Sequence, residues 1–132
     1  MIVLDASATV DVLLRLGEQA EWVEARVAEA ASLHAPHLID YEVVAALRGR
    51  TLAGKVSAAR GASALQDYLD LPLRRYPAAH LLKRIWQLRP NLSSYDAAYI
   101  ALAEALGAPL VTTDGRLARA SGHRAAIESF PG

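Results

Sequence analysis

The chain has 132 residues, with 14 basic and 14 acidic side chains that give a net charge of zero, and it has no cysteine. This length is typical of one domain, and the lack of cysteine excludes a disulfide framework and any thiolate metal site. No apolar stretch approaches the ~20 residues of a membrane span, and the first residues lack the basic segment of a signal peptide. We therefore expect a single domain over residues 1–132 that does not enter a membrane and works in the reducing cytoplasm.

Short apolar runs alternate with longer amphipathic stretches along the chain. The runs predict five strands, at Ile2–Leu4, Leu33–Ala35, Leu71–Tyr76, Leu110–Thr112 and Ala125–Ile127. The stretches between them predict helices, the first capped by Ser7 and ending near Gly17, followed by Glu18–Ala30, Pro36–Leu52, Ser57–Leu69, Pro77–Leu88, one from Ser93 to Gly107, and a short one after Asp114. Strands that alternate with helices predict an α/β fold of three layers, α/β/α, with a central, mostly parallel sheet of four to five strands.

Four carboxylates stand where a domain of this kind usually has apolar residues. Asp5 ends the apolar run Ile2–Leu4, and Asp114 follows the run that begins at Leu110. Glu42 and Asp96 have leucine, isoleucine, tyrosine or alanine at positions three and four residues away, so each lies on the apolar face of a predicted helix.

The placement of these acids indicates a cation site. The carboxyl ends of parallel strands form one edge of a sheet, and ligands bind in the crevice outside that edge. Crowded carboxylates repel each other and burial disfavours their charge, so such a cluster persists at low cost only with a cation between them. Oxygen ligands without cysteine favour Mg²⁺ or Mn²⁺. Taken singly, each acid has an ordinary explanation, as a helix cap, a turn residue or a partly exposed side chain.

Four motifs resemble the PIN-domain family of metal-dependent ribonucleases and, within it, the VapC-type toxins of bacterial toxin–antitoxin pairs. These motifs are "IVLDASA", "HLIDYEVVAALR", "LSSYDAAYIALA" and "LVTTDGRLA". The order and spacing of four acids match the catalytic quartet of the family, and two hydroxyl residues match positions that line the same site: Asp5, Glu42, Asp96 and Asp114, with Ser7 and Thr112.

The resemblance implies an endoribonuclease that cuts structured RNA, with a small VapB-type antitoxin as partner and a homodimer as assembly. It implies one or two Mg²⁺ or Mn²⁺ ions that activate water for in-line attack, leaving a 3′-hydroxyl and a 5′-phosphate. The first three acids would coordinate directly or through water, and the fourth would complete the set. The two hydroxyl residues would orient ligands or waters.

Basic residues near the acidic edge are candidates for contacts with RNA phosphates, because phosphate contacts dominate affinity for nucleic acids: Arg48, Arg50, Arg116 and Arg119. The four histidines form no pair suited to metal-free RNA cleavage, so we expect structural or solvent-facing roles for them. Asp40, in the first turn of its predicted helix, is expected to cap the helix or interact with its dipole rather than to catalyse.

Other classes of protein share parts of this pattern. A phosphatase of the haloacid dehalogenase type also ends its first strand in an aspartate, but generally carries a second acid where this chain has Ser7. A phosphorelay receiver domain would need paired acids after the first strand. A non-catalytic binding module with the PIN fold would be marked by loss of one or more of the four acids, and all are present.

Overall fold

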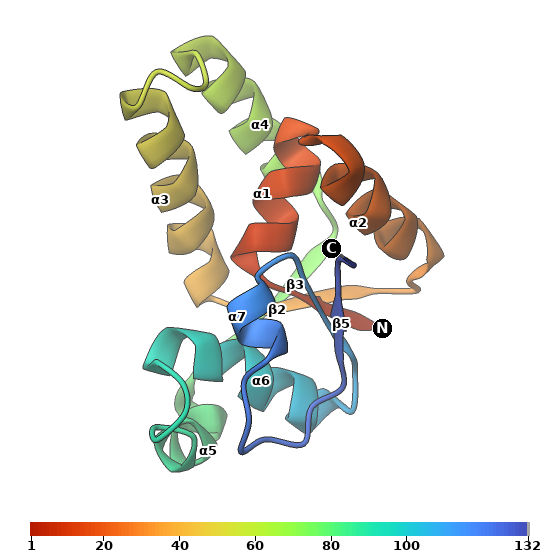
Figure 1. Ribbon diagram of the computed structural model, residues 1–132, viewed down its shortest axis with the longest axis vertical. Coiled ribbons are helices and arrows are strands. Elements are labelled where there is room, and N and C mark those ends of the chain that lie inside the picture. Colours follow the sequence, from red (N-terminus) through yellow and green to blue (C-terminus); the bar gives the residue numbers. More distant parts are fainter. Residues whose placement is uncertain (132) are drawn as a thin grey trace.

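A parallel β-sheet forms the centre of the protein, which we describe from a computed structural model covering residues 1–131 (Figure 1). Its five strands are β1 (Ile2–Leu4), β2 (Leu33–Pro36), β3 (Leu73–Tyr76), β4 (Leu110–Thr112) and β5 (Ile127–Ser129), in the order β3-β2-β1-β4-β5. Every neighbouring pair of these strands is parallel. The middle strand, β1, is completely buried, as expected for a strand covered on both faces.

Helices cover both faces of the sheet and complete the expected α/β/α arrangement. They are α1 (Ala6–Leu14), α2 (Gly17–Glu29), α3 (Leu38–Leu52), α4 (Ala58–Asp70), α5 (Leu82–Gln87), α6 (Ser94–Leu106) and α7 (Gly115–Ala118), with a 3₁₀ turn, η1 (Ala79–Leu81), before α5. Figure 1 shows α1 to α4 on one side of the sheet and α5 and α6 on the other, with α3 and α4 projecting as a helical hairpin. The predicted fold class is thus confirmed.

Asp5, not Ser7, caps helix α1. The Oδ1 atom of Asp5 accepts a hydrogen bond from the backbone N–H of Ala8 at 2.9 Å, and the Asp5 backbone is extended, as an N-cap requires. Ser7 already lies within the first turn of the helix. The prediction that α1 continues to near Gly17 is also wrong, because the left-handed backbone of Arg15, with φ of 56°, ends the helix at Leu14.

Further boundaries differ from those predicted, including the starts of α3 and β3, which each lie two residues later, at Leu38 and Leu73. The expected helix over Pro77–Leu88 is divided into η1 and the six-residue α5, in keeping with the frequency of 3₁₀ turns at helix starts. The last strand lies two residues later than predicted, because the register with β4 pairs Leu110 with Ile127. Strand β5 is an edge strand with partly exposed residues, so its apolar pattern is weak.

The path of α6 brings its first turn to the carboxyl edge of the sheet. Residues Ala97–Ala103 of α6 are buried, and Gly107, with φ of 62°, ends the helix and turns the chain back into β4. Because β4 begins where α6 ends, the start of α6 lies at the opposite edge, where the strands end. Within residues 1–131, no helix combines the length and the apolar character that crossing a membrane requires.

Candidate active site

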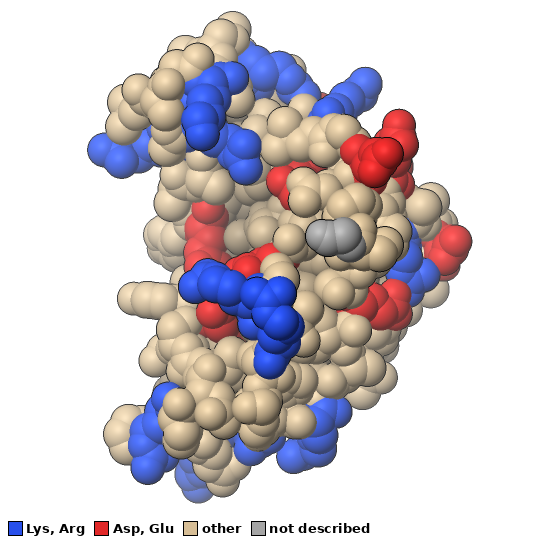
Figure 2. Space-filling view, viewed as in Figure 1, with Lys and Arg blue, Asp and Glu red and all other residues tan. Residues whose placement is uncertain are grey.

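All four predicted acids lie at the carboxyl edge of the parallel sheet. Asp5 directly follows β1, and Asp114 stands two residues after β4 as the N-cap of α7. Glu42 lies in the second turn of α3, which starts shortly after β2, and Asp96 lies in the first turn of α6. Figure 2 shows acidic residues beside basic ones in the middle of this face, between the α3–α4 hairpin and the part of the molecule that holds α5 and α6.

Asp5 is a buried carboxylate surrounded by neutral donors. Its Oδ1 atom accepts hydrogen bonds from the Ser7 hydroxyl at 2.8 Å and from the Ala8 N–H, and its Oδ2 atom accepts a short one from the hydroxyl of Thr112. Among residues 1–131, no basic side chain pairs with it. Burial outweighs these hydrogen bonds and raises the pKa of Asp5 to about 6, and the charge of Asp114 adds to the rise.

The segment Thr112–Asp114 connects the two acids that follow strands. The hydroxyl oxygen of Thr112 accepts a hydrogen bond from the backbone N–H of Asp114 at 2.9 Å, while its proton is donated to Asp5. The backbone N–H of Thr113 donates to the Ser7 hydroxyl at 3.3 Å. Ser7 and Thr112, which were expected to orient the site, therefore contact Asp5 directly, and they link it to the backbone at Thr113 and at Asp114, respectively.

Glu42 is held by a residue that the sequence did not single out. The buried phenol of Tyr99 on α6 donates a hydrogen bond of 2.6 Å to Glu42 Oε1 on α3. Burial raises the pKa of Tyr99, and the charges of Glu42 and Asp5 raise it further, so this phenol remains protonated and lies near both acids. Asp96 precedes Tyr99 by one helical turn on α6, and its side chain is partly exposed.

The donor atoms suit a hard cation, although the side chains are not gathered around one point. The four acids supply only carboxylate oxygens, the ligands that Mg²⁺ and Mn²⁺ prefer. In the part of the chain that is described, no three His, Asp or Glu side chains converge closely enough to hold one ion. Asp5 and Asp114 lie near each other, whereas Glu42 turns to Tyr99 and Asp114 caps α7, accepting from the Arg116 N–H at 2.9 Å.

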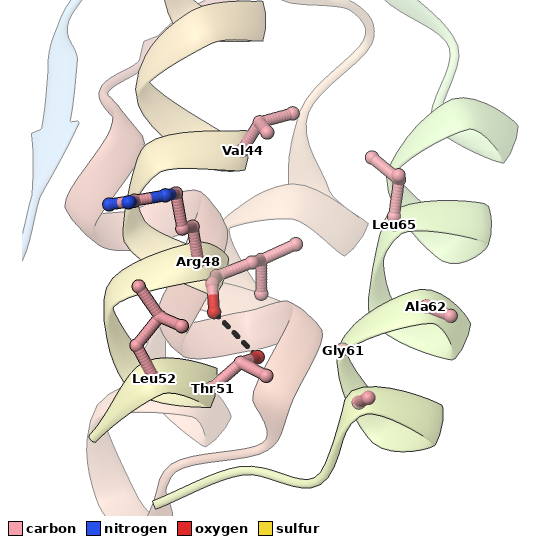
Figure 3. Close-up of a pocket in the computed structure, with 9 residues that line it drawn as sticks. Val44, Arg48, Thr51, Leu52, Gly61, Ala62 and Leu65 are labelled. Atoms are coloured by element: carbon pink, nitrogen blue, oxygen red, sulfur yellow. Dashed lines mark hydrogen bonds between the residues drawn. The ribbon is translucent and has the colours of Figure 1, made fainter. Parts of the chain in front are cut away.

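The candidate RNA-binding arginines divide into two groups. The Arg116 guanidinium lies 3.3 Å from Asp114, Arg119 follows it on the same exposed turn, and Arg50 Nη2 lies 4.0 Å from Asp11. Arg48 instead lines a groove of about 260 Å³ between α3 and α4, together with apolar residues such as Val44 and Leu65 (Figure 3). This groove contains no acid, so it is separate from the carboxylate site.

Asp40 has a structural role, as expected, but not as a helix cap. Its Oδ1 atom accepts hydrogen bonds from the Tyr68 hydroxyl at 2.6 Å and from Arg75 Nε at 2.7 Å, which joins α3 to α4 and β3. Burial alone would raise the pKa of Asp40, but these two donors together lower it. The histidines agree with their predicted roles, since His34 is buried between Ser32 and Tyr76 and His37 and His80 are exposed.

Asp11 and Thr113 were also missed by the sequence analysis. Asp11 is buried on α1, and its Oδ2 atom accepts a hydrogen bond of 2.7 Å from the Thr113 hydroxyl. The helical spacing that drew attention to Glu42 also applies to Asp11, because Ala8 and Leu14 lie three residues to either side. No local pattern distinguishes Thr113 from an ordinary loop threonine.

Comparison with known proteins assigns the chain to a family. Residues 2–122 match the PIN domain. Ribonuclease VapC9 of Mycobacterium tuberculosis is 46% identical over 117 residues, which span 89% of this chain and 88% of that protein. Ribonuclease VapC12 of the same organism is 43% identical over 128 residues, which span 97% of this chain and 98% of that protein.

A solved structure shows the same fold at low sequence identity. The crystal structure of VapBC2 from Rickettsia felis, bound to a DNA fragment from its promoter, superposes with a TM-score of 0.70 at 16% identity. The superposition covers 99% of this chain and 100% of that one.

The chain therefore belongs to the PIN-domain family and, within it, to the VapC-type ribonucleases. It is an endoribonuclease of the toxin–antitoxin class, as the sequence motifs implied. Ribonucleases of this class are generally dependent on divalent metal ions. The match to the PIN domain over most of the chain favours this family over the phosphatase and receiver domains that the sequence pattern also suggested.

Proposed function

We propose that Asp5, Glu42, Asp96 and Asp114 form the active site and hold Mg²⁺ or Mn²⁺, one or two ions at a time. The observation that carries this proposal is the Asp5 carboxylate, which is buried at the end of a parallel strand with only neutral donors around it and another acid nearby. A divalent cation would compensate its charge and that of Asp114. Bound there, the ion supplies an activated water and stabilises the negative charge that develops on the phosphate.

The remaining residues of the site orient the acids. Ser7 and Thr112 fix both oxygens of Asp5, and the Thr112 oxygen also holds the backbone at Asp114. The Tyr99 phenol fixes one oxygen of Glu42, and within residues 1–131 the other oxygen accepts no hydrogen bond. Such outer contacts typically change metal affinity or activity by about 10- to 100-fold when they are removed. Arg50, Arg116 and Arg119 are the candidates for drawing phosphates toward this acidic edge.

The proposed partners are an RNA substrate, a small antitoxin of the VapB type and a second copy of the chain. The kinship with VapC ribonucleases supports the first two, and the VapBC2 structure, which contains both members of such a pair, supports the second. Homodimer formation rests on the sequence resemblance. The cytoplasm is the compartment we propose, in keeping with a chain that has no cysteine.

Cleavage of total cellular RNA by antitoxin-free protein tests the proposal. Wild type is compared with Asp5→Asn, Glu42→Gln, Asp96→Asn and Asp114→Asn in Mg²⁺, Mn²⁺ or EDTA. We expect discrete cuts that require metal, carry 5′-phosphates and decrease about 100-fold or more in each variant. Asp40→Asn is the matched control, because it neutralises a carboxylate that pairs with Arg75 and Tyr68 on other elements.

Three results would count against the active site proposed here. Cuts that persist in EDTA or end in 2′,3′-cyclic phosphates would indicate attack by the RNA 2′-hydroxyl instead of water. Full activity of Asp5→Asn would place the chemistry elsewhere on the molecule. Absence of any cleavage by wild type under every metal would favour a non-catalytic binding module.

A further inference from the structure

Asp11 is a buried carboxylate that the proposed chemistry does not use. It lies on α1, six residues after Asp5, and only 7% of its surface is exposed. Both of its oxygens face polar groups of other elements. Oδ2 accepts a hydrogen bond of 2.7 Å from the Thr113 hydroxyl, and Oδ1 lies 4.0 Å from Nη2 of Arg50. A charged group at this depth is costly unless it is paired, so the site must retain these contacts.

The contacts of Asp11 join three segments, each of which contains one of the proposed site acids or lies next to one. Helix α1 begins directly after Asp5, the loop at Thr113 leads to Asp114, and α3 carries Glu42 two turns before Arg50. The distance of 4.0 Å to Arg50 is at the limit of an ion pair, so among residues 1–131 the Thr113 hydroxyl makes the one hydrogen bond to the Asp11 side chain.

Two adjacent threonines, Thr112 at the end of β4 and Thr113 in the loop after it, hydrogen-bond in different directions. Thr112 donates its hydroxyl to Asp5, whereas Thr113 donates its own to Asp11. Asp114 follows directly, and its backbone N–H is bound by Thr112. Like charges at Asp5 and Asp114 repel each other, and this repulsion would push the loop away from β1. The bond from Thr113 to Asp11 opposes such movement.

We propose that Asp11 is a positioning residue, which acts through the Thr113 hydroxyl to hold Asp114 at the distance from Asp5 that binding of the divalent ion requires. The proposal rests on the proposed active site, because it assigns Asp114 to that site. Asp11 itself touches neither ion nor RNA. It sets the geometry of the residues that do.

The test measures Mn²⁺ binding by electron paramagnetic resonance or calorimetry, together with kcat and KM for RNA. Asp11→Ala removes the carboxylate, and Thr113→Val removes only the hydroxyl that donates to it. We expect each to weaken Mn²⁺ binding and lower kcat by about 10- to 100-fold, while KM stays near that of wild type. Thr113→Ser keeps the hydroxyl and should restore both values. The double variant should lose no more than either single variant, because the two groups act as one unit.

Matched controls separate positioning from a general loss of stability. Asp40→Ala removes a carboxylate that also binds a hydroxyl and an arginine, and Thr51→Val removes a hydroxyl bound to the Leu47 carbonyl within α3. Neither should change Mn²⁺ affinity, and Asp40→Ala should lower the melting temperature. The proposal is overturned if Asp11→Ala and Thr113→Val match these controls, or if their losses multiply in the double variant. If wild type itself neither binds Mn²⁺ nor cuts RNA, the proposed active site fails instead.

Discussion

Replacing Asp5 by asparagine should stabilise the metal-free protein at neutral pH while it abolishes cleavage. Asparagine can keep the helix cap, because its oxygen can accept from the Ala8 N–H and the Ser7 hydroxyl as Asp5 Oδ1 does. Its amide nitrogen would face Thr112, whose hydroxyl oxygen has two lone pairs and uses one for the Asp114 N–H. The substitution therefore removes a buried charge, and the Thr112 hydroxyl, which loses Asp5 Oδ2 as its acceptor, can donate instead to the Ser7 hydroxyl oxygen 3.3 Å away.

The size of the effect follows from the pKa of Asp5. Burial raises this pKa from 3.8 to about 6, so the folded state binds the proton more tightly than the unfolded state. The contribution of Asp5 to stability therefore falls as the pH rises from about 4 to about 6. The full loss is about 3 kcal/mol, of which about 2 kcal/mol falls between about pH 4.5 and pH 7.5. Asparagine does not titrate, so the variant escapes this loss.

Chemical denaturation in EDTA at these two pH values measures the difference. Comparing variant with wild type at each pH cancels every other titrating group that the two share. The free energy of unfolding of Asp5→Asn, relative to wild type, should increase by about 2 kcal/mol from the lower to the higher pH. Asp40→Asn should change little between these two pH values, because Tyr68 and Arg75 lower the pKa of Asp40 and its contribution to stability is lost only at more acidic pH.

One result would refute this reasoning. If Asp5→Asn is less stable than wild type at neutral pH in EDTA, and the difference does not depend on pH, then Asp5 is a structural group whose hydrogen bonds outweigh its desolvation. The inference of a cation beside Asp5 would then lose its physical basis.

Three further predictions concern metal binding at Asp5, the hydrogen bond between Tyr99 and Glu42, and the buried His34. Adding Mg²⁺ should raise the melting temperature of wild type more than that of Asp5→Asn, by the equivalent of about 2.7 kcal/mol at 100 times the dissociation constant, and equal shifts in a thermal scan would contradict binding at Asp5. Tyr99→Phe removes the donor to Glu42 and should lower kcat by about tenfold with normal folding by circular dichroism, whereas unchanged kinetics would show that Glu42 needs no such support. Burial lowers the pKa of His34, so wild type should lose stability as the pH falls below about 6.5, and melts of His34→Gln should show a smaller loss over the same range.

The sequence predicted the fold because its signals are local. A fully apolar run such as Ile2–Leu4 indicates a strand buried on both faces wherever it occurs, and caps such as Ser57 and Ser93 mark helix starts through bonds to residues three positions away. Errors arose where local signals compete. Asp5 and Ser7 are both good N-caps, and only the backbone conformation at Asp5 decides between them.

The placement of the four acids at one edge of the sheet also follows from the sequence, since parallel strands and the helices between them determine which ends lie together. Their partners do not follow from it. Thr112 reaches Asp5, Tyr99 reaches Glu42 and Thr113 reaches Asp11 across long stretches of chain. Whether such groups meet depends on the angles at which the helices pack on the sheet, because a hydrogen bond requires its atoms to lie within about 3 Å. Those angles are set by the tertiary structure, which therefore decided how each acid is held.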